Sequence, residues 1–188
     1  MKKTILVGAG GHANVVYDVL CENNKKISGF IDPSVNAFYA LEKLSDDFSD
    51  FTQTSLVMCL GAVAPESLQR RYKLFCQYRE KSADFLSVIS NHSIVSNNAK
   101  IGEGVFVNNG AVINGPCEIQ ALAIINTRAI IEHDVIVGAG THIAPGAIVL
   151  GNCQIGKNCM IGAGAVILPN TTIPDNSLIP SLTRYPRT

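Results

Sequence analysis

Aliphatic side chains recur at every sixth position through the second half of the chain. Counted from Ile89, sixteen consecutive members of this series, up to Ile179, are all Ile or Val. Two positions before each of them lies a second series, from Ser87 to Ser177, whose members are all Ser, Ala, Thr, Cys or Val. A period of six fits neither an amphipathic helix nor the alternation of an ordinary strand. It predicts a triangular solenoid of short parallel strands, in which three hexads form one coil of eighteen residues.

In such a solenoid the aliphatic series fills the core, and the small series fits the crowded interior near the corners. Neighbouring coils pair as parallel strands, so each residue stacks on its eighteenth neighbour about 4.8 Å away. Cys117, Cys153 and Cys159 belong to the small inward series, and we expect them to be packed rather than reactive. None of the six cysteines stands in a CxxC or metal-ligand spacing, which indicates reduced thiols.

The first half has the pattern of a small parallel α/β domain. Apolar runs at residues 4–7, 27–31 and 55–60 predict buried strands. Apolar positions at helical spacing predict a helix over residues 13–20, and a proline opens a second one over residues 65–80. The order of strand, glycine turn, helix and strand is that of a βαβ unit.

Composition and charge narrow the class of protein. Hydrophobic residues make up 47% of the chain, and fifteen basic side chains balance fifteen acidic ones. With no net charge, the chain has no overall electrostatic attraction for nucleic acid or an anionic membrane. No apolar stretch is long enough for membrane insertion. We expect an α/β domain over residues 1–84, the solenoid over 85–182 and a short tail over 183–188. No cleavage-type segment follows the N-terminal lysines, so we expect a cytoplasmic protein.

A glycine-rich turn, Gly8-Ala9-Gly10-Gly11-His12, follows the first predicted strand. Glycines let the backbone approach a phosphate closely, and the N-terminus of the next helix favours an anion. Asp32, at the end of the second strand, stands where a carboxylate could hydrogen-bond a ribose hydroxyl. The turn matches a loose dinucleotide fingerprint, but the domain is short for a complete dinucleotide-binding fold, so NAD binding is the weaker alternative.

The two halves together resemble the NeuD/PglD-like sugar acetyltransferases. These comprise sialic acid O-acetyltransferases and enzymes that N-acetylate nucleotide-linked 4-amino-4,6-dideoxy sugars. The resemblance spans about residues 4–180 and rests on Gly10-Gly11-His12 after a strand, Gly-Phe-Ile-Asp at 29–32 and the hexapeptide repeats. It implies a Rossmann-like α/β domain that holds the sugar nucleotide, followed by an all-β left-handed parallel β-helix that holds acetyl-CoA. It also implies a homotrimer with clefts between neighbouring subunits.

His133 is the candidate catalytic base. It follows an inward aliphatic residue by two places, so its side chain should project from the surface of the coil. The neighbouring Asp134 would fix the tautomer of the imidazole and strengthen it as a base. Glycines stand eighteen residues away on either side, at Gly115 and Gly151, which would leave room for a thioester, with the Gly151 N–H as an oxyanion donor. The resemblance assigns these same roles to His133, Asp134 and Gly151.

The resemblance implies further site residues. Asn126 matches a polar residue near the base, although it could equally belong to a polar ladder with Asn108. His142 matches a histidine that hydrogen-bonds CoA from a neighbouring subunit, and otherwise would be an exposed polar residue between coils. Ala163 is also expected beside CoA. The residues expected to bind the sugar and its nucleotide are Gly10, Gly11, His12, Asp32 and Gly61.

Some features depart from related folds. A related fold class binds zinc through three histidines, but only His133 and His142 lie in the body of this coil, so no metal is expected. After residue 177 the sequence departs from the family's usual ending, a further coil and a Gly-x-Pro-Ala-Lys loop that help to hold CoA. Arg128 stands where relatives often carry a small residue, and would reshape the acceptor pocket.

The leading hypothesis is an acetyl-CoA-dependent acetyltransferase that acts on the amino group of a nucleotide-linked 4-amino-dideoxy sugar, in bacterial surface glycan synthesis. One alternative is O-acetylation of sialic acid. A second is a catalytically degenerate trimeric scaffold that binds a sugar nucleotide and has lost its hold on CoA.

Overall fold

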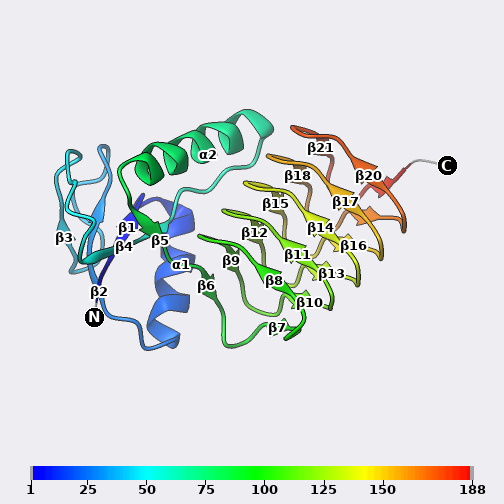
Figure 1. Cartoon of the computed structure of the whole chain (residues 1–188), viewed down its shortest axis with the longest axis horizontal. Coiled ribbons are helices and arrows are strands. Elements are labelled where there is room, and N and C mark those ends of the chain that lie inside the picture. The colour runs from blue at the N-terminus through cyan, green and yellow to red at the C-terminus, as the bar shows by residue number, and fades with distance from the viewer. Residues whose placement is uncertain (1, 187–188) are drawn as a thin grey trace.

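The computed structural model describes residues 2–186 and comprises an α/β domain followed by a long parallel β-helix (Figure 1). The five strands of the domain are parallel and lie in the order β3-β2-β1-β4-β5. They are β1 (Lys3–Val7), β2 (Ile27–Ile31), β3 (Glu42–Lys43), β4 (Thr54–Met58) and β5 (Asp84–Phe85). The helices are α1 (Gly11–Glu22) and α2 (Pro65–Glu80).

The apolar runs form the three long strands as predicted, and the structure adds two short edge strands, β3 and β5. These two were missed because a two-residue strand carries no periodic signal. Helix α1 buries its apolar side, Val16 to Leu20, against one face of the sheet, and α2 packs Phe75 on the other face. Gly8 ends β1 at φ +99°, and a Cβ there would lie 2.7 Å from Leu60 Cδ2, so this turn requires glycine.

The β-helix has three faces, each a ladder of two-residue parallel strands. The first face consists of β6 (Val88–Ile89), β9 (Phe106–Val107), β12 (Ile124–Ile125), β15 (His142–Ile143), β18 (Met160–Ile161) and β21 (Leu178–Ile179). The second consists of β7 (Ile94–Val95), β10 (Val112–Ile113), β13 (Ile130–Ile131), β16 (Ile148–Val149), β19 (Val166–Ile167) and β22 (Arg184–Tyr185). The third consists of β8 (Lys100–Ile101), β11 (Glu118–Ile119), β14 (Ile136–Val137), β17 (Gln154–Ile155) and β20 (Thr172–Ile173).

The eighteen-residue register is kept throughout, and the coil is the left-handed parallel β-helix that the resemblance implied. Both inward series form one continuous core, which includes the three packed cysteines. Left-handed backbone at the corners is supplied mostly by glycine, Asn and Asp, residues that tolerate it, and also by Leu122, Arg128 and Leu182. Strand β22 pairs with β19, so the coil extends into the segment that the sequence indicated as a tail.

The three faces differ in what covers their outer side. The α/β domain packs on the first face, where Val88, Phe106 and Ile124 join the core under α1. Helix α2 runs along the edge between the third and first faces (Figure 1), where Gln69 Nε2 donates to Asn176 Oδ1 at 2.8 Å. The second face instead presents a row of aliphatic side chains, which we call the apolar stripe. It consists of Ile94, Val112, Ile130, Ile148 and Val166.

Candidate functional site

The structure separates the predicted site residues of the coil into two places. His133 lies in the turn between β13 and β14, on the edge where the second face meets the third. His142 points outward from β15 on the first face, and Asn126 follows β12 of that same face. In a triangular prism the edge between two faces lies opposite the third face. A single copy therefore holds His133 and His142 on opposite sides of its coil.

The first place, which we call the exposed edge, consists of His133, Asp134 and Gly151. His133 Nδ1 lies 2.8 Å from Asp134 Oδ2, and the two side chains are 61% and 54% exposed. Because an ionised carboxylate only accepts hydrogen bonds, the imidazole carries its proton on Nδ1 and keeps the lone pair of Nε2 free. The Asp134 N–H donates to Pro116 O at 2.7 Å, which fixes the acid beside the ring.

Gly151 lies directly against the imidazole of His133. A Cβ at this position would come within 2.7 Å of both Cε1 and Nε2 of the ring, so the histidine occupies the space that a side chain would take. Within residues 2–186 the Gly151 N–H donates to no acceptor. Gly115, one coil earlier, serves a different purpose, because a Cβ there would collide with Ser96 and Asn98. Of the two predicted glycines, Gly151 is the one at which a side chain would displace the histidine.

The second place, which we call the interface cluster, consists of His12, Gly61, Arg71, Asn126 and His142. The His142 Nδ1–H donates to Ala62 O at 2.8 Å, and Asn126 Nδ2 donates to His142 Nε2 at 3.0 Å. Asn126 Oδ1 in turn accepts from Asn108 Nδ2 at 3.0 Å, so the ladder considered for Asn126 is present.

His142 is only 6% exposed, which differs from the exposed position between coils that one interpretation of the sequence gave it. The physical reason is that the α/β domain covers the outer side of the first face. Burial lowers the pKa of His142, the charge of Arg71 lowers it further, and the hydrogen bond to Ala62 acts in the opposite direction. The ring is therefore neutral at physiological pH.

His12 stands at the start of α1, with its ring edge-on to Phe106 at 5.2 Å between centroids. A Cβ at Gly61 would lie 2.9 Å from His12 Cβ, so the turn after β4 packs tightly on this histidine. Burial lowers the pKa of His12 to about 3, and the neighbouring Arg71 and His142 act in the same direction. Its Nε2 is buried and has no partner within residues 2–186.

Arg71, which the sequence analysis missed, ties the domain to the coil. Its Nε donates to Leu60 O at 2.9 Å and its Nη1 to Leu122 O at 2.5 Å, while Nη2 is buried without a partner among the described residues. The side chain is 2% exposed, and burial lowers its pKa to about 9. The available signal was its position in α2, between Leu68 and Phe75 on the stripe that faces the core.

The Asp32 carboxylate has a structural role in this part of the molecule. Its Oδ2 accepts from the Ala9 N–H at 2.8 Å, and its Oδ1 accepts from the backbone N–H groups of Ser34 and Val35. The carboxylate thus fastens the glycine turn to the loop after β2. A Cβ at Gly10 or Gly11 would meet nothing within 4 Å, so the N-terminus of α1 faces open space.

Ala163 lies in the turn between β18 and β19, on the same edge as Asn126, where the first face meets the second. It is therefore not near His133 within one chain. Among the described residues, no three His, Cys, Asp or Glu side chains gather where they could hold a metal ion. In the same part of the chain, no helix combines the length and apolar character needed to cross a membrane.

Family models match both halves of the chain. The PglD N-terminal domain matches residues 3–62, and the bacterial transferase hexapeptide model (six repeats) matches residues 152–183. A search of curated proteins found no match.

Several solved structures share the whole fold. A variant of perosamine N-acetyltransferase from Caulobacter crescentus, in which one histidine is replaced by asparagine, was solved in complex with CoA and GDP-perosamine. It is 27% identical to this chain, with a TM-score of 0.88. The alignment covers 96% of this chain and 87% of that one. The acetyltransferase domain of PglB from Neisseria gonorrhoeae is 24% identical, over 96% and 89% of the two chains, with a TM-score of 0.88. WeeI from Acinetobacter baumannii is 19% identical, over 99% and 98%, with a TM-score of 0.76.

Proposed function

Because this chain belongs to the NeuD/PglD-like sugar acetyltransferases, we propose that it acetylates the amino group of a nucleotide-linked 4-amino-dideoxy sugar with acetyl-CoA. The observation that carries the proposal is the exposed edge, where an imidazole with a free Nε2 lies against a glycine with a free amide. Support for the substrate class comes from the Caulobacter enzyme, which is named for N-acetylation and was solved with CoA and GDP-perosamine.

His133 acts as the general base in this proposal. Its Nε2 accepts the proton of the acceptor amine while the amine nitrogen attacks the thioester carbonyl, and Asp134 holds the ring in the tautomer that makes this possible. The Gly151 N–H stabilises the negative charge that develops on the carbonyl oxygen. When the carbon–sulfur bond breaks, the proton passes from His133 to the departing thiolate of CoA.

The apolar stripe supports a site shared between copies of the chain. Ile94 at its start is 67% exposed, and a continuous aliphatic row of this kind marks an interaction surface. The stripe is flanked by the edge that carries His133 on one side and by the edge that carries Asn126 and Ala163 on the other. If a second copy covers the stripe, the exposed edge of one copy meets the interface cluster of the next. A cyclic homotrimer closes this arrangement with three equal sites.

The remaining predicted residues take their places in this shared site. Ala163 and Gly151 line the acetyl-CoA side. We assign His142 no contact with CoA, because Asn126 and Ala62 O occupy both of its ring nitrogens, and it holds the α/β domain against the coil instead. The sugar nucleotide is held by Gly10, Gly11, His12 and Gly61, with Asp32 shaping the glycine turn. The setting in bacterial surface glycan synthesis, in the cytoplasm, stays a prediction.

The test is release of CoA thiol from acetyl-CoA with a panel of nucleotide-linked 4-amino sugars and sialic acid. We expect release with an amino sugar, and its loss by about 10²- to 10⁴-fold in His133→Ala, with the oligomeric state unchanged. Release with sialic acid alone would replace the proposal by O-acetylation. Near-normal turnover by the variant would remove His133 as the base, and no binding of acetyl-CoA at millimolar concentration would favour the inactive scaffold.

A further inference from the structure

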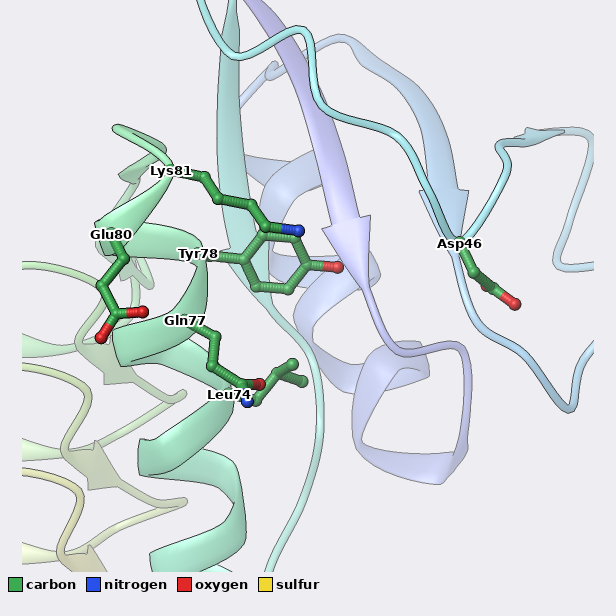
Figure 2. A pocket seen from close by; sticks show the side chains of 6 residues that line it. All are labelled: Asp46, Leu74, Gln77, Tyr78, Glu80 and Lys81. Atoms are coloured by element: carbon green, nitrogen blue, oxygen red, sulfur yellow. The ribbon is translucent and has the colours of Figure 1, made fainter.

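A cleft separates helix α2 from the segment between β3 and β4, close to the glycine turn. Its inner part has a volume of about 250 Å³ and mainly apolar walls, and Gly8 at the end of β1 opens onto it. These walls are formed by Val7, Ile31, Leu60 and Leu74. The outer part, about 400 Å³, is lined by polar and charged side chains as well as by Leu74 (Figure 2). Asp46, Leu74 and Tyr78 line both parts, so the two form one continuous space comparable to small-ligand sites.

Charged side chains of both signs line this space: Asp32, Asp46, Glu80 and Lys81. The Asp32 carboxylate already accepts from backbone N–H groups, and Figure 2 shows the Glu80 carboxylate directed away from Tyr78, which leaves Asp46 and Lys81 for a ligand. Figure 2 shows Asp46 alone on one side, while Tyr78 and Lys81 stand on the other, at the end of α2. Neither Asp46 nor Lys81 uses its side chain in a hydrogen bond or ion pair within residues 2–186. Asp46 and Tyr78 both line this space, and burial together with the charge of Asp46 raises the pKa of Tyr78.

Such a cleft suits a flat aromatic ring with a particular pattern of donors and acceptors. Guanine carries two adjacent donors, N1–H and the N2 amino group, and two acceptors, O6 and N7, along its other edge. A carboxylate accepts from the donor pair with both oxygens, and an ammonium group donates to the acceptor pair. Asp46 and Lys81 offer these two groups on opposite walls.

Other bases fit this charge pattern less well. Uracil and thymine present one N–H between two carbonyl oxygens, and a carboxylate repels both oxygens. Adenine and cytosine place a ring acceptor directly beside their amino group, so they too offer a carboxylate only one donor. The pattern on the two walls therefore discriminates between bases through the number of donors that Asp46 can engage.

We propose that this cleft binds the nucleobase of the sugar substrate and selects guanine, with Asp46 and Lys81 as the specificity-determining residues. The inference rests on the proposed function and deepens it, since it names a guanosine diphosphate-linked amino sugar as the acceptor. The groups that would bind the diphosphate and the sugar follow the cleft along the chain. From Gly8 in the cleft the turn leads to the open N-terminus of α1 at Gly10 and Gly11, which favours a diphosphate, and then to His12.

The experiment is calorimetric titration of the full chain with GDP, UDP, dTDP and ADP, without acetyl-CoA. We expect GDP to bind at least about 10-fold more tightly than the other three, because only guanine engages both oxygens of Asp46. Asp46→Asn replaces one acceptor by a donor, and should weaken GDP binding by about 10- to 100-fold while leaving UDP binding unchanged. Lys81→Met should weaken GDP binding by a smaller factor.

Asp47→Asn is the matched control, because Asp47 is an exposed neighbour on the same segment and does not line the cleft. It should leave the binding of every nucleotide unchanged. Equal or tighter binding of UDP or dTDP by the unmodified chain would overturn the proposal, and so would an equal loss in Asp46→Asn and Asp47→Asn.

The result is separable from that of the acetyl-transfer assay. An Asp46-dependent preference for GDP in a chain that transfers no acetyl group would support the cleft and contradict the proposed function. Acetyl transfer to a UDP-linked sugar with no preference for GDP would support the proposed function and contradict guanine selection by the cleft.

Discussion

His133 and His142 stand nine residues apart in the same repeat, yet their surroundings are opposite. His133 is exposed on an edge, next to a carboxylate and a bare glycine backbone. His142 is buried under the α/β domain, with both ring nitrogens bound to neutral partners. The repeat alone does not distinguish them, because each projects outward from the coil. What covers each face decides which histidine can exchange protons with a substrate and which one holds two domains together.

The largest effect that separates the two histidines is on catalysis. His133→Ala should reduce turnover by about 10²- to 10⁴-fold and leave the melting temperature unchanged, because the exposed ring stabilises little. His142→Ala should lower the melting temperature, since it leaves Asn126 and Ala62 O without their partner beneath the domain. Steady-state kinetics and thermal unfolding of both variants check this, and a stable His142→Ala protein would contradict the buried role.

A smaller loss is expected from Gly151→Ala. The new methyl group would lie 2.7 Å from the ring of His133, so the imidazole must swing away, and turnover should fall by about 10- to 100-fold. The same substitution should destabilise the native chain more than it destabilises the His133→Ala variant, in which the ring is absent. A double-mutant cycle on unfolding free energies measures this coupling, and additive effects would show that ring and glycine do not touch.

Acid should weaken the interface cluster. Folding lowers the pKa values of His12 and His142, so below about pH 6.5 the unfolded chain binds protons that the folded chain refuses. Stability is therefore complete above pH 6.5 and falls as the pH drops toward 3. The loss is up to about 1.4 kcal/mol per pH unit for each histidine.

Urea unfolding between pH 7 and pH 4.5 measures this slope. His142→Gln should flatten it, and His92→Gln should not, because the His92 side chain is 68% exposed and outside the cluster. Equal slopes in all three proteins would contradict the assignment.

The smallest effect is expected from Asp134→Asn. Asparagine tolerates the left-handed backbone at this corner, where φ is 59°, so the fold should be kept. The amide oxygen still accepts from Nδ1–H, but the negative charge beside the ring is lost. Because both side chains are exposed to water, we expect turnover to fall by only about 3- to 10-fold. A loss as large as that of His133→Ala would mean that the acid is more than a positioning residue.

The coil could be predicted from sequence because each hexad repeats one local rule, so sixteen aliphatic positions report the same structure. The exposed edge followed from that register, which places Gly151 one coil after His133. The burial of His142 did not follow, because it depends on the docking of a separate domain through Ala62. Arg71 was missed for the same reason. Its carbonyl partners, Leu60 and Leu122, lie far from it in sequence, and an arginine within a helix usually reaches solvent.

The most direct test of the shared site is complementation between two inactive variants. His133→Ala lacks the exposed edge, and His12→Ala lacks part of the interface cluster, so each should be inactive alone. In mixed trimers formed from equal amounts of both, a site is intact when the edge of one variant meets the cluster of the other. We predict that about one quarter of the native acetyl-transfer activity returns on mixing and co-refolding. No recovery, in trimers shown to contain both chains, would contradict a site built from two copies.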